Sequence, residues 1–212
     1  MKTTDAVHSH GEILSLHETR KEEIRRKLDQ FTRVASTDYF YELAYCLLTP
    51  QSSAANAGKV IEALRSAEFL EADVDPIPLL RRKEYYIRFH NTKSQHLRAM
   101  KSGFPAIAQR LSNGCSGPEL REWLVANVKG LGLKEASHFL RNIGYRDLAI
   151  LDRHILRNLI RFGVIRRIPV SLTAKRYKSI EKKFLVFSRK IGIPMDELDL
   201  LFWSMETGEI LK

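Results

Sequence analysis

Cysteine is scarce in this 212-residue sequence, which contains only Cys46 and Cys115. Two cysteines so far apart exclude a disulfide-stapled scaffold. They also provide too few thiolates for an iron–sulfur cluster or a cysteine-rich zinc site. Low cysteine usage is typical of proteins that work in a reducing compartment, so we expect a cytoplasmic protein.

Long apolar runs are also missing. No stretch approaches the ~20 consecutive apolar residues that a membrane-spanning helix needs. Met1–Gly11 has no apolar core, so we expect no secretory signal and no membrane partner. Hydrophobic residues make up 44% of the chain and charged residues 28%, which is typical of a globular protein with a buried core. We expect residues 1–212 to form a single functional unit.

Acidic residues are almost absent from one segment of the chain. Residues 153–190 contain twelve Lys or Arg and a single acid, Glu181, although the whole chain has a net charge of only +10. A folded basic face of this kind favours a polyanionic partner, most simply nucleic acid; a solvated, lysine-rich surface is the alternative. Apolar residues at intervals indicate that the segment is folded rather than a basic tail: Ile155, Leu159, Phe162, Phe184 and Phe187.

Strand patterns are nearly absent as well, because only Glu84–Phe89 has strand character and it is too short to seed a sheet. Helical periodicity covers most of the chain, so we predict an all-α fold of about nine to eleven helices, arranged as two lobes with a cleft. No clear lobe boundary is visible. The expected helices include Glu12–Phe31, Tyr39–Leu48 with Thr37 or Asp38 as its cap, and one from Pro50 to about Ser66. Helices are expected to start after Pro105, Pro118 and Pro194, and to stop at Gly103, Gly114, Gly144, Gly163 and Gly192.

The segment of about residues 118–143 has the pattern of two helices joined by a glycine-containing hairpin. The first helix is expected over Pro118–Asn127 and the second over Lys134–Ile143. Gly130 and Gly132 permit a tight turn with positive φ angles and leave the backbone N–H groups uncovered. Such groups near a helix N-terminus bind anions, so the hairpin suits a DNA phosphate. An ordinary interhelical turn is the alternative.

Lys134 and Asp152 are the candidate catalytic residues. Lys134 stands at the start of a helix, where the helix dipole disfavours a positive charge, and a lysine nucleophile must be neutral. An exposed lysine in a first helical turn is nevertheless common. Asp152 precedes a helical run and suits an N-cap, and one carboxylate oxygen can cap while the other faces a cleft.

These residues match a known superfamily. The segment Gly130-x-Gly132-x-Lys134, followed by Leu151-Asp152-x-His154, resembles the helix–hairpin–helix DNA glycosylases. The resemblance implies that Lys134 and Asp152 form the catalytic pair and that Gly130, Gly132 and His154 contact DNA phosphates. Lys129 stands where the superfamily usually has proline, and the four-cysteine cluster of some of its branches is absent.

Further motifs resemble the archaeal and bacterial second-type 8-oxoguanine DNA glycosylase/lyases. This resemblance implies excision of 8-oxoguanine from double-stranded DNA and cleavage at the abasic site, by a monomer that acts on nucleoid DNA without metal, cofactor or obligate protein partner. It also implies that Gln51 and Phe89 fill the gap left in the duplex, and that Trp203 and the carboxylate-bearing Lys212 contact the damaged base. The motifs are Leu48-Thr49-Pro50-Gln51-Ser52, Arg88-Phe89-His90-Asn91, Val128-Lys129-Gly130-Leu131-Gly132 and the ending Trp203-Ser204-Met205-Glu206-Thr207-Gly208 to Lys212.

Simpler interpretations stay open for these four side chains: a helix-surface glutamine, a core phenylalanine, a core tryptophan and a frayed terminal lysine. Two other functions also stay open. One is a glycosylase for alkylated or mismatched bases. The other is a non-catalytic helix–hairpin–helix module, which would leave the spacing of Lys134 and Asp152 unexplained.

Overall fold

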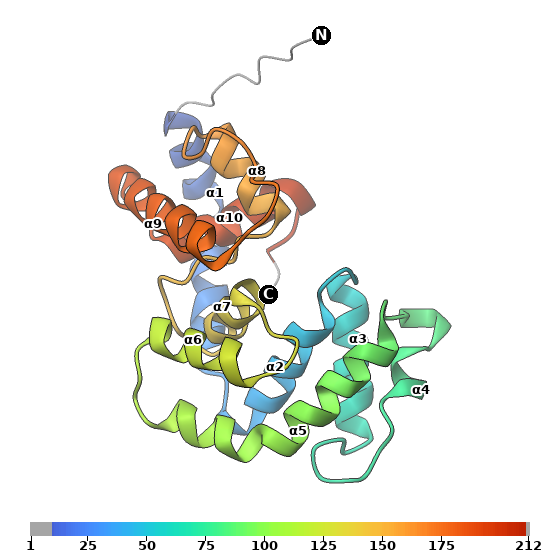
Figure 1. Cartoon of the computed structure of the whole chain (residues 1–212). Coiled ribbons are helices and arrows are strands. Elements are labelled where there is room, and N and C mark those ends of the chain that lie inside the picture. The colour runs from blue at the N-terminus through green and yellow to red at the C-terminus, as the bar shows by residue number, and fades with distance from the viewer. Residues whose placement is uncertain (1–9, 211–212) are drawn as a thin grey trace. The chain divides into compact units, whose positions relative to one another are not determined.

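The computed structural model describes residues 10–210, and every regular element within this range is a helix (Figure 1). The predicted all-α fold is therefore confirmed for the described chain. The chain divides into two compact units. The first consists of the residues up to Arg33 and from Leu140 onward, and the second of Val34–Phe139. None of the helices within residues 10–210 is long and apolar enough to cross a membrane.

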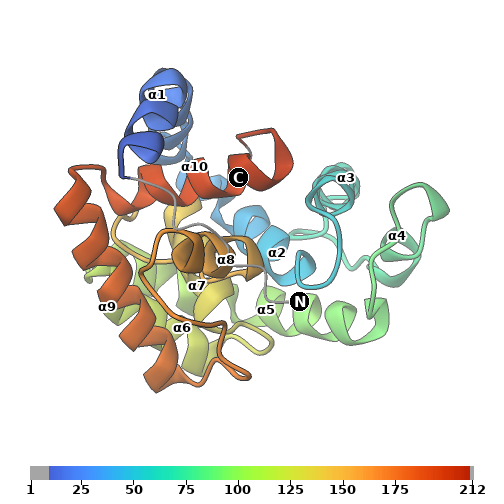
Figure 2. The same ribbon diagram turned by 90° about the horizontal axis from the view of Figure 1, so that it is seen from above.

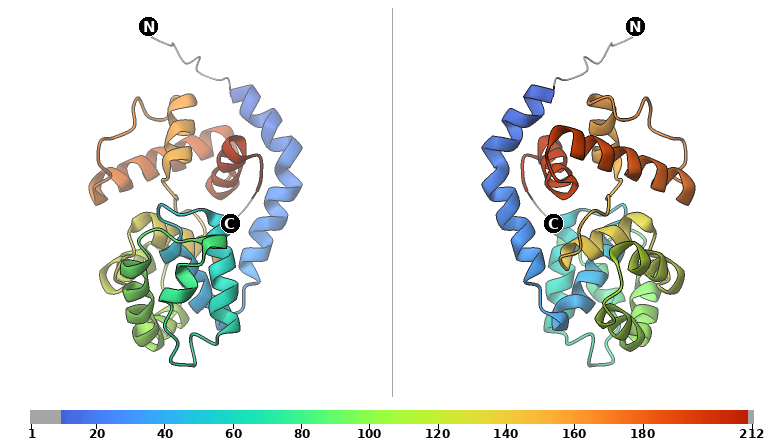
Figure 3. Two further views of the ribbon diagram at one scale, coloured as in Figure 1. Left: turned by 90° about the vertical axis from the view of Figure 1, so that its right-hand side faces the viewer. Right: turned by 90° about the vertical axis from the view of Figure 1, so that its left-hand side faces the viewer.

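The first unit is built around the last helix of the chain. Helix α10 (Met195–Thr207) packs against α1 (His10–Thr32), α8 (Arg153–Arg161) and α9 (Ala174–Ile191). Figure 3 shows the long α1 running beside α10, and Figure 2 shows α10 next to α8 and α9. This unit is therefore closed by the first and the last helices of residues 10–210. Its fully buried residues include Ile13, Ile24, Leu159, Phe184 and Phe202.

Buried ion pairs connect α10 to its neighbours within this unit. Glu197 accepts from Arg25 Nε at 3.0 Å, and its other oxygen lies 2.6 Å from His17 Nε2. Arg141 Nη1 donates to Asp199 Oδ2 at 2.6 Å, and both side chains are almost completely buried. Glu197 and Asp199 thus each have a basic partner, which a buried charge requires.

The second unit has α2 (Tyr39–Leu48) at its centre. Every residue from Phe40 to Leu48 is buried, and α2 packs against both α3 (Ala54–Ser66) and α5 (His90–Ser112) (Figure 2). The short α4 (Ile77–Leu80) lies against α3 and α5, and α6 (Gly117–Asn127) packs on α5. Helix α7 (Leu133–Asn142) follows α6 and contains the boundary between the units. Two single-turn 3₁₀ helices complete the set, at Ser36–Asp38 and Lys83–Tyr85.

One predicted helix cap and one predicted helix start are wrong. A 3₁₀ turn leads directly into α2, so Asp38 makes no side-chain capping bond to it and Thr37 lies within that turn. Pro50 lies in a loop rather than in a first helical turn, because α3 begins only at Ala54. Its cap is Ser53, whose Oγ accepts from Asn56 N at 3.0 Å.

The expected break at Gly103 is also wrong, since both Gly103 and Pro105 lie inside α5. Their positions are exposed, so water can satisfy the carbonyl that loses its partner at the proline. Pro118 does lie in the first turn of α6, and Pro194 directly precedes α10, as predicted. The other four glycines follow helix ends with positive φ, as predicted: Gly114, Gly144, Gly163 and Gly192.

Candidate active site

The hairpin between α6 and α7 forms as predicted, and Gly130 is its central residue. Gly130 has a φ of 88°, and a Cβ added there would lie 2.2 Å from Nδ1 of His96 on α5. Burial, together with the positive charge of Lys129, lowers the pKa of His96, which favours the neutral imidazole. Gly130 is therefore required both by the left-handed backbone and by the close approach of this ring.

Gly132 does not have the predicted positive φ. A Cβ at Gly132 would instead lie 2.9 Å from Oε2 of Glu135. The Gly132 carbonyl accepts from Ala136 N at 2.9 Å and so opens the first turn of α7. Neither a positive φ nor a contact with rigid backbone therefore requires glycine at this position, because a larger residue would displace only the flexible end of Glu135.

Lys134 lies in that first turn, as predicted. Its side chain is only 30% exposed, and Nζ lies 3.1 Å from Oε1 of Glu135, whose side chain is 14% exposed. The exposed-lysine alternative therefore does not describe this residue. An acidic side chain is favourable at this end of a helix, where Glu135 offsets the charge of its neighbour.

Asp152 is the N-cap of α8, as the capping interpretation predicted. Its Oδ1 accepts from both His154 N and Ile155 N at 2.8 Å. Lys134 belongs to the second unit and Asp152 to the first. Their pairing in one active site, and the cleft that would hold them, therefore stay predictions.

Gln51 and Phe89 share an unusual backbone. Gln51 has a φ of 56° and Phe89 a φ of 58°, both left-handed and both uncommon for residues with side chains. Gln51 is exposed in the loop between α2 and α3, so its placement in a helix was wrong. Phe89 is 54% exposed at the start of α5, so the core interpretation is also wrong.

Hydrogen bonds join the two segments that carry these side chains. Ser52 Oγ accepts from Arg88 N at 3.1 Å, and Asn56 Nδ2 donates to Tyr86 O at 3.1 Å. The loop before α3 and the segment before α5 thus form one connected surface region. The guanidinium carbon of Arg88 lies 5.5 Å from the centre of the Phe89 ring.

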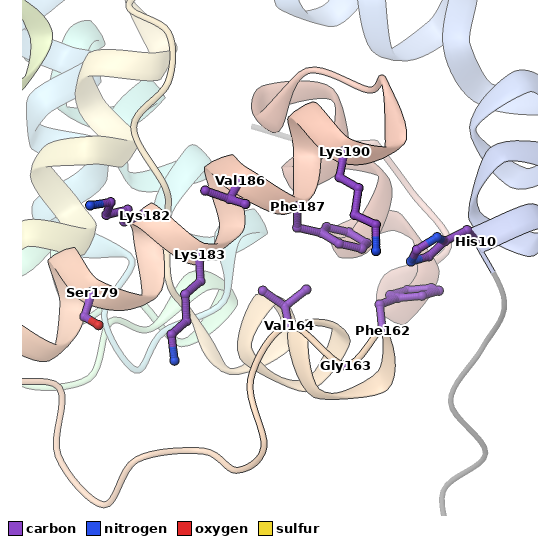
Figure 4. Close-up of a pocket in the computed structure, with 10 residues that line it drawn as sticks. All are labelled: His10, Phe162, Gly163, Val164, Ser179, Lys182, Lys183, Val186, Phe187 and Lys190. Atoms are coloured by element: carbon purple, nitrogen blue, oxygen red, sulfur yellow. The ribbon is translucent and has the colours of Figure 1, made fainter.

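The basic segment 153–190 forms α8, α9 and the loop between them. Its five apolar residues named above are all buried, which confirms that the segment is folded. An open pocket of about 560 Å³ lies beside α9. Figure 4 shows Phe162 and Phe187 of its lining close to His10. Basic side chains surround this apolar floor, and binding of a polyanion by the segment stays a prediction. The lysines that line the pocket are Lys182, Lys183 and Lys190.

Comparison with known proteins identifies the family. A sequence model described as 8-oxoguanine DNA glycosylase matches residues 22–193. The chain belongs to the 8-oxoguanine DNA glycosylase family. A Fusobacterium nucleatum relative named 8-oxoguanine DNA glycosylase/AP lyase is 38% identical, over 95% of this chain and 97% of its own. A Korarchaeum cryptofilum relative of the same name is 37% identical over the same shares.

Solved structures of family members have the same fold. The 8-oxoguanine DNA glycosylase of Methanocaldococcus jannaschii aligns with a TM-score of 0.84 and 29% identity, covering 97% of this chain and all of its own. The glycosylase/lyase of that organism in complex with a 15mer DNA containing 8-oxoguanine aligns with a TM-score of 0.82 and 30% identity, covering 94% and 99% of the two chains.

Three further residues predicted from the family resemblance lie near the end of the chain or on α8. Trp203 is partly exposed on α10, unlike the fully buried Phe202 beside it, so it is not simply a core residue. His154 lies in the first turn of α8, where Nε2 accepts from Arg153 Nε at 3.2 Å and Nδ1 lies 3.5 Å from Glu206 Oε2. Lys212 lies outside the described residues. The roles of these three residues in this member of the glycosylase family stay predictions.

Sequence reasoning missed one residue of this region, Lys93 on α5. Its side chain is buried, and Nζ donates to the oxygens of three residues around Gln51. A lysine in a mostly polar helix start gives no local signal of burial. Among residues 10–210, no group of three or more His, Cys, Asp or Glu side chains could hold a metal ion.

Proposed function

We propose that this chain is a bifunctional DNA repair enzyme that excises 8-oxoguanine from double-stranded DNA and then cleaves the strand at the abasic site. One observation carries the proposal: the chain matches relatives named 8-oxoguanine DNA glycosylase/AP lyase over nearly the full length of both. The position of Lys134 in the first turn of α7, directly after the glycine hairpin, supports it.

The first step is extrusion of the damaged nucleotide, because its glycosidic bond is out of reach inside a duplex. Extrusion costs a few kcal/mol, which binding of phosphates by the hairpin and the basic segment offsets. Gln51 and Phe89 then occupy the space that the base leaves. Their exposure on two connected segments suits this role.

The second step is covalent catalysis by Lys134. Its neutral amine attacks the anomeric carbon, the bond to the base breaks, and the base leaves with a proton. The carboxylate of Asp152 stabilises the positive charge that develops on the sugar. Opening of the sugar ring gives a Schiff base between Lys134 and the anomeric carbon. Loss of a C2′ proton then expels the 3′ phosphate and cuts the strand.

Recognition of the lesion is a hydrogen-bond problem. 8-Oxoguanine carries a proton on N7, where guanine has a lone pair, so an acceptor at this position favours the lesion and penalises guanine. We assign the acceptor to Lys212 and its carboxylate, and a stacking or lining role to Trp203. The enzyme acts as a monomer on nucleoid DNA in the cytoplasm, without an obligate protein partner.

The test is covalent trapping. The protein is incubated with a duplex containing 8-oxoguanine opposite cytosine, borohydride is added, and the products are separated under denaturing conditions. We expect a protein–DNA adduct that Lys134→Gln abolishes. Lys59→Gln, which removes an exposed lysine on α3, should leave the adduct unchanged.

Other outcomes would contradict the proposal in different ways. Nicking without an adduct would exclude the Schiff base. Cleavage only of duplexes with alkylated or mismatched bases would change the substrate. DNA binding with neither nicking nor an adduct would leave a non-catalytic helix–hairpin–helix module.

A further inference from the structure

Lys93 is a buried lysine whose three donor hydrogens all have acceptors. It is 5% exposed, and Nζ donates to Leu48 O at 2.7 Å, Pro50 O at 2.6 Å and Ser52 Oγ at 3.1 Å. An ammonium group has three N–H donors, so this set is complete. Burial of a charged group is costly unless it is hydrogen-bonded, so these bonds account for its place in the unit.

The acceptors lie on both sides of Gln51. Leu48 O belongs to the last turn of α2, while Pro50 and Ser52 are the two chain neighbours of Gln51. The left-handed φ of 56° at Gln51 is uncommon for a residue with a side chain. Such a conformation persists when the surrounding structure determines it, and the bonds from Lys93 are interactions of this kind.

The same network continues to Phe89. Ser52 Oγ, which accepts from Lys93, also accepts from the backbone N of Arg88, the residue directly before Phe89. Phe89 has the other left-handed φ of this region and begins the helix that carries Lys93. One buried ammonium group is thus linked to the chain neighbours of both Gln51 and Phe89, and the hydroxyl of Ser52 joins the two segments.

The network also lies near Lys134. Burial lowers the pKa of Lys93 to about 8, and the positive charges of Lys134 and then Arg88 contribute to this shift. The ammonium of Lys93 is therefore within electrostatic reach of the proposed nucleophile. The segments that carry Gln51 and Phe89 are thereby tied to the same part of the second unit as Lys134.

We propose that Lys93, acting through Ser52, is a positioning residue. It holds the segments of Gln51 and Phe89 in the relative position that opens the duplex at the lesion. The inference rests on the proposed glycosylase function, because it assigns Lys93 to the extrusion step of that reaction. Lys93 itself touches neither the base nor the sugar. The competing explanation is a purely structural role, in which Lys93 only satisfies the carbonyl groups at and after the end of α2.

The variants separate these explanations. Ser52→Ala removes the link to Arg88 N and keeps the two bonds from Lys93 to backbone carbonyls. Thr49→Ala is the matched control, because it removes a hydroxyl from the same loop whose bond is local, to Cys46 O at 3.1 Å. Lys93→Met removes all three bonds, and urea unfolding of each variant measures any decrease in stability.

The measurement compares two substrates in single-turnover reactions. One duplex contains 8-oxoguanine opposite cytosine, and the other contains an abasic site that needs no base extrusion. We expect Ser52→Ala and Lys93→Met to slow 8-oxoguanine excision by about 10- to 100-fold, a typical effect of misplaced groups, and abasic-site nicking by less than about threefold. 2-Aminopurine beside the lesion should brighten on binding of the wild type and less with these variants.

Proportional losses on both substrates, or equal behaviour of Ser52→Ala and Thr49→Ala, would overturn the positioning role while leaving the enzyme function intact. If Lys93→Met fails to fold, the two loop variants still decide the question. A wild-type protein inactive on both duplexes would contradict the proposed function itself. That result differs from active variants in which the ratio of 8-oxoguanine excision to abasic-site nicking equals that of the wild type.

Discussion

At the scale of single residues, Asp152 shows how one side chain can have a structural and a chemical role. Both capping bonds to α8 go to the same oxygen, Oδ1, at 2.8 Å. The cap fixes the orientation of the carboxyl group, so the second oxygen has a defined direction. An amide in place of the carboxylate would preserve the cap and remove the charge.

We therefore predict different effects for two substitutions of Asp152. Asp152→Asn keeps an acceptor for His154 N and should change the free energy of unfolding by less than about 0.5 kcal/mol, while Asp152→Ala should lower it by about 1 kcal/mol. Both should slow 8-oxoguanine excision by about 100-fold or more, because each removes the negative charge. Urea denaturation and single-turnover excision measure the two quantities. Excision by Asp152→Asn within about threefold of the wild type would exclude a catalytic carboxylate.

Glycine shows what a sequence can and cannot specify at this scale. The hairpin pattern predicted a left-handed residue, and Gly130 is one, with a φ of 88°. The pattern could not show that the ring of His96, over thirty positions away, lies against Gly130, nor that Gly132 lacks a positive φ and lies close to Glu135. Close approaches of this kind depend on tertiary structure.

At the scale of elements, the predictions succeeded where the apolar pattern is continuous and failed where they relied on single proline or glycine residues alone. Helix α2 has the predicted bounds, and its continuous apolar sequence is buried on all sides from Phe40 to Leu48. Helix α5 passes through Gly103 and Pro105, since its remaining residues pack well enough to override both. The left-handed Gln51 and Phe89 were not predictable, because hydrogen bonds from distant parts of the chain hold them.

The ion pair between α7 and α10 gives a pH-dependent prediction. Burial raises the pKa of Asp199 to about 7, the charges of Asp152 and Asp196 add to this shift, and Arg141 opposes it. The folded chain thus keeps a proton that the unfolded chain, with a pKa near 3.8, releases. The stability from this group is complete below pH 3.8 and disappears as the pH rises through about 7.

We therefore expect the wild type to lose stability relative to Asp199→Asn as the pH is raised from about 4 to about 8, measured by urea unfolding at each pH. The exposed Asp73→Asn is the control, and its difference from the wild type should show no such trend. A constant difference between wild type and Asp199→Asn would mean that Asp199 stays ionised throughout.

At the scale of the whole molecule, the charge is concentrated rather than spread. The twelve basic residues of segment 153–190 account for the entire net charge of +10, so the rest of the chain is close to neutral. We expect this distribution to produce a directional field that attracts a polyanion to this segment. The segment belongs entirely to the first unit.

Charge reversal within this segment should therefore weaken duplex binding more than the same change elsewhere. Lys182→Glu with Lys183→Glu should lower affinity and reduce the slope of log K against log salt, by about 0.9 for each phosphate that the protein no longer neutralises. The control, Arg26→Glu with Lys59→Glu, makes the same change in net charge at exposed positions outside the segment. Fluorescence anisotropy across a salt series measures both. Equal effects of the two pairs would show that only the total charge matters.

The pairing of the first helix with the last has a consequence for how the protein is made. Helix α1, whose buried residues include Ile13, Ile24 and Leu28, leaves the ribosome long before α10, the helix it packs against, is synthesised. Residues 34–139 are contiguous and can acquire their core during translation, whereas the first unit closes only after Met195–Thr207 has been synthesised. A nascent chain halted before Met195 would therefore present α1 to chaperones.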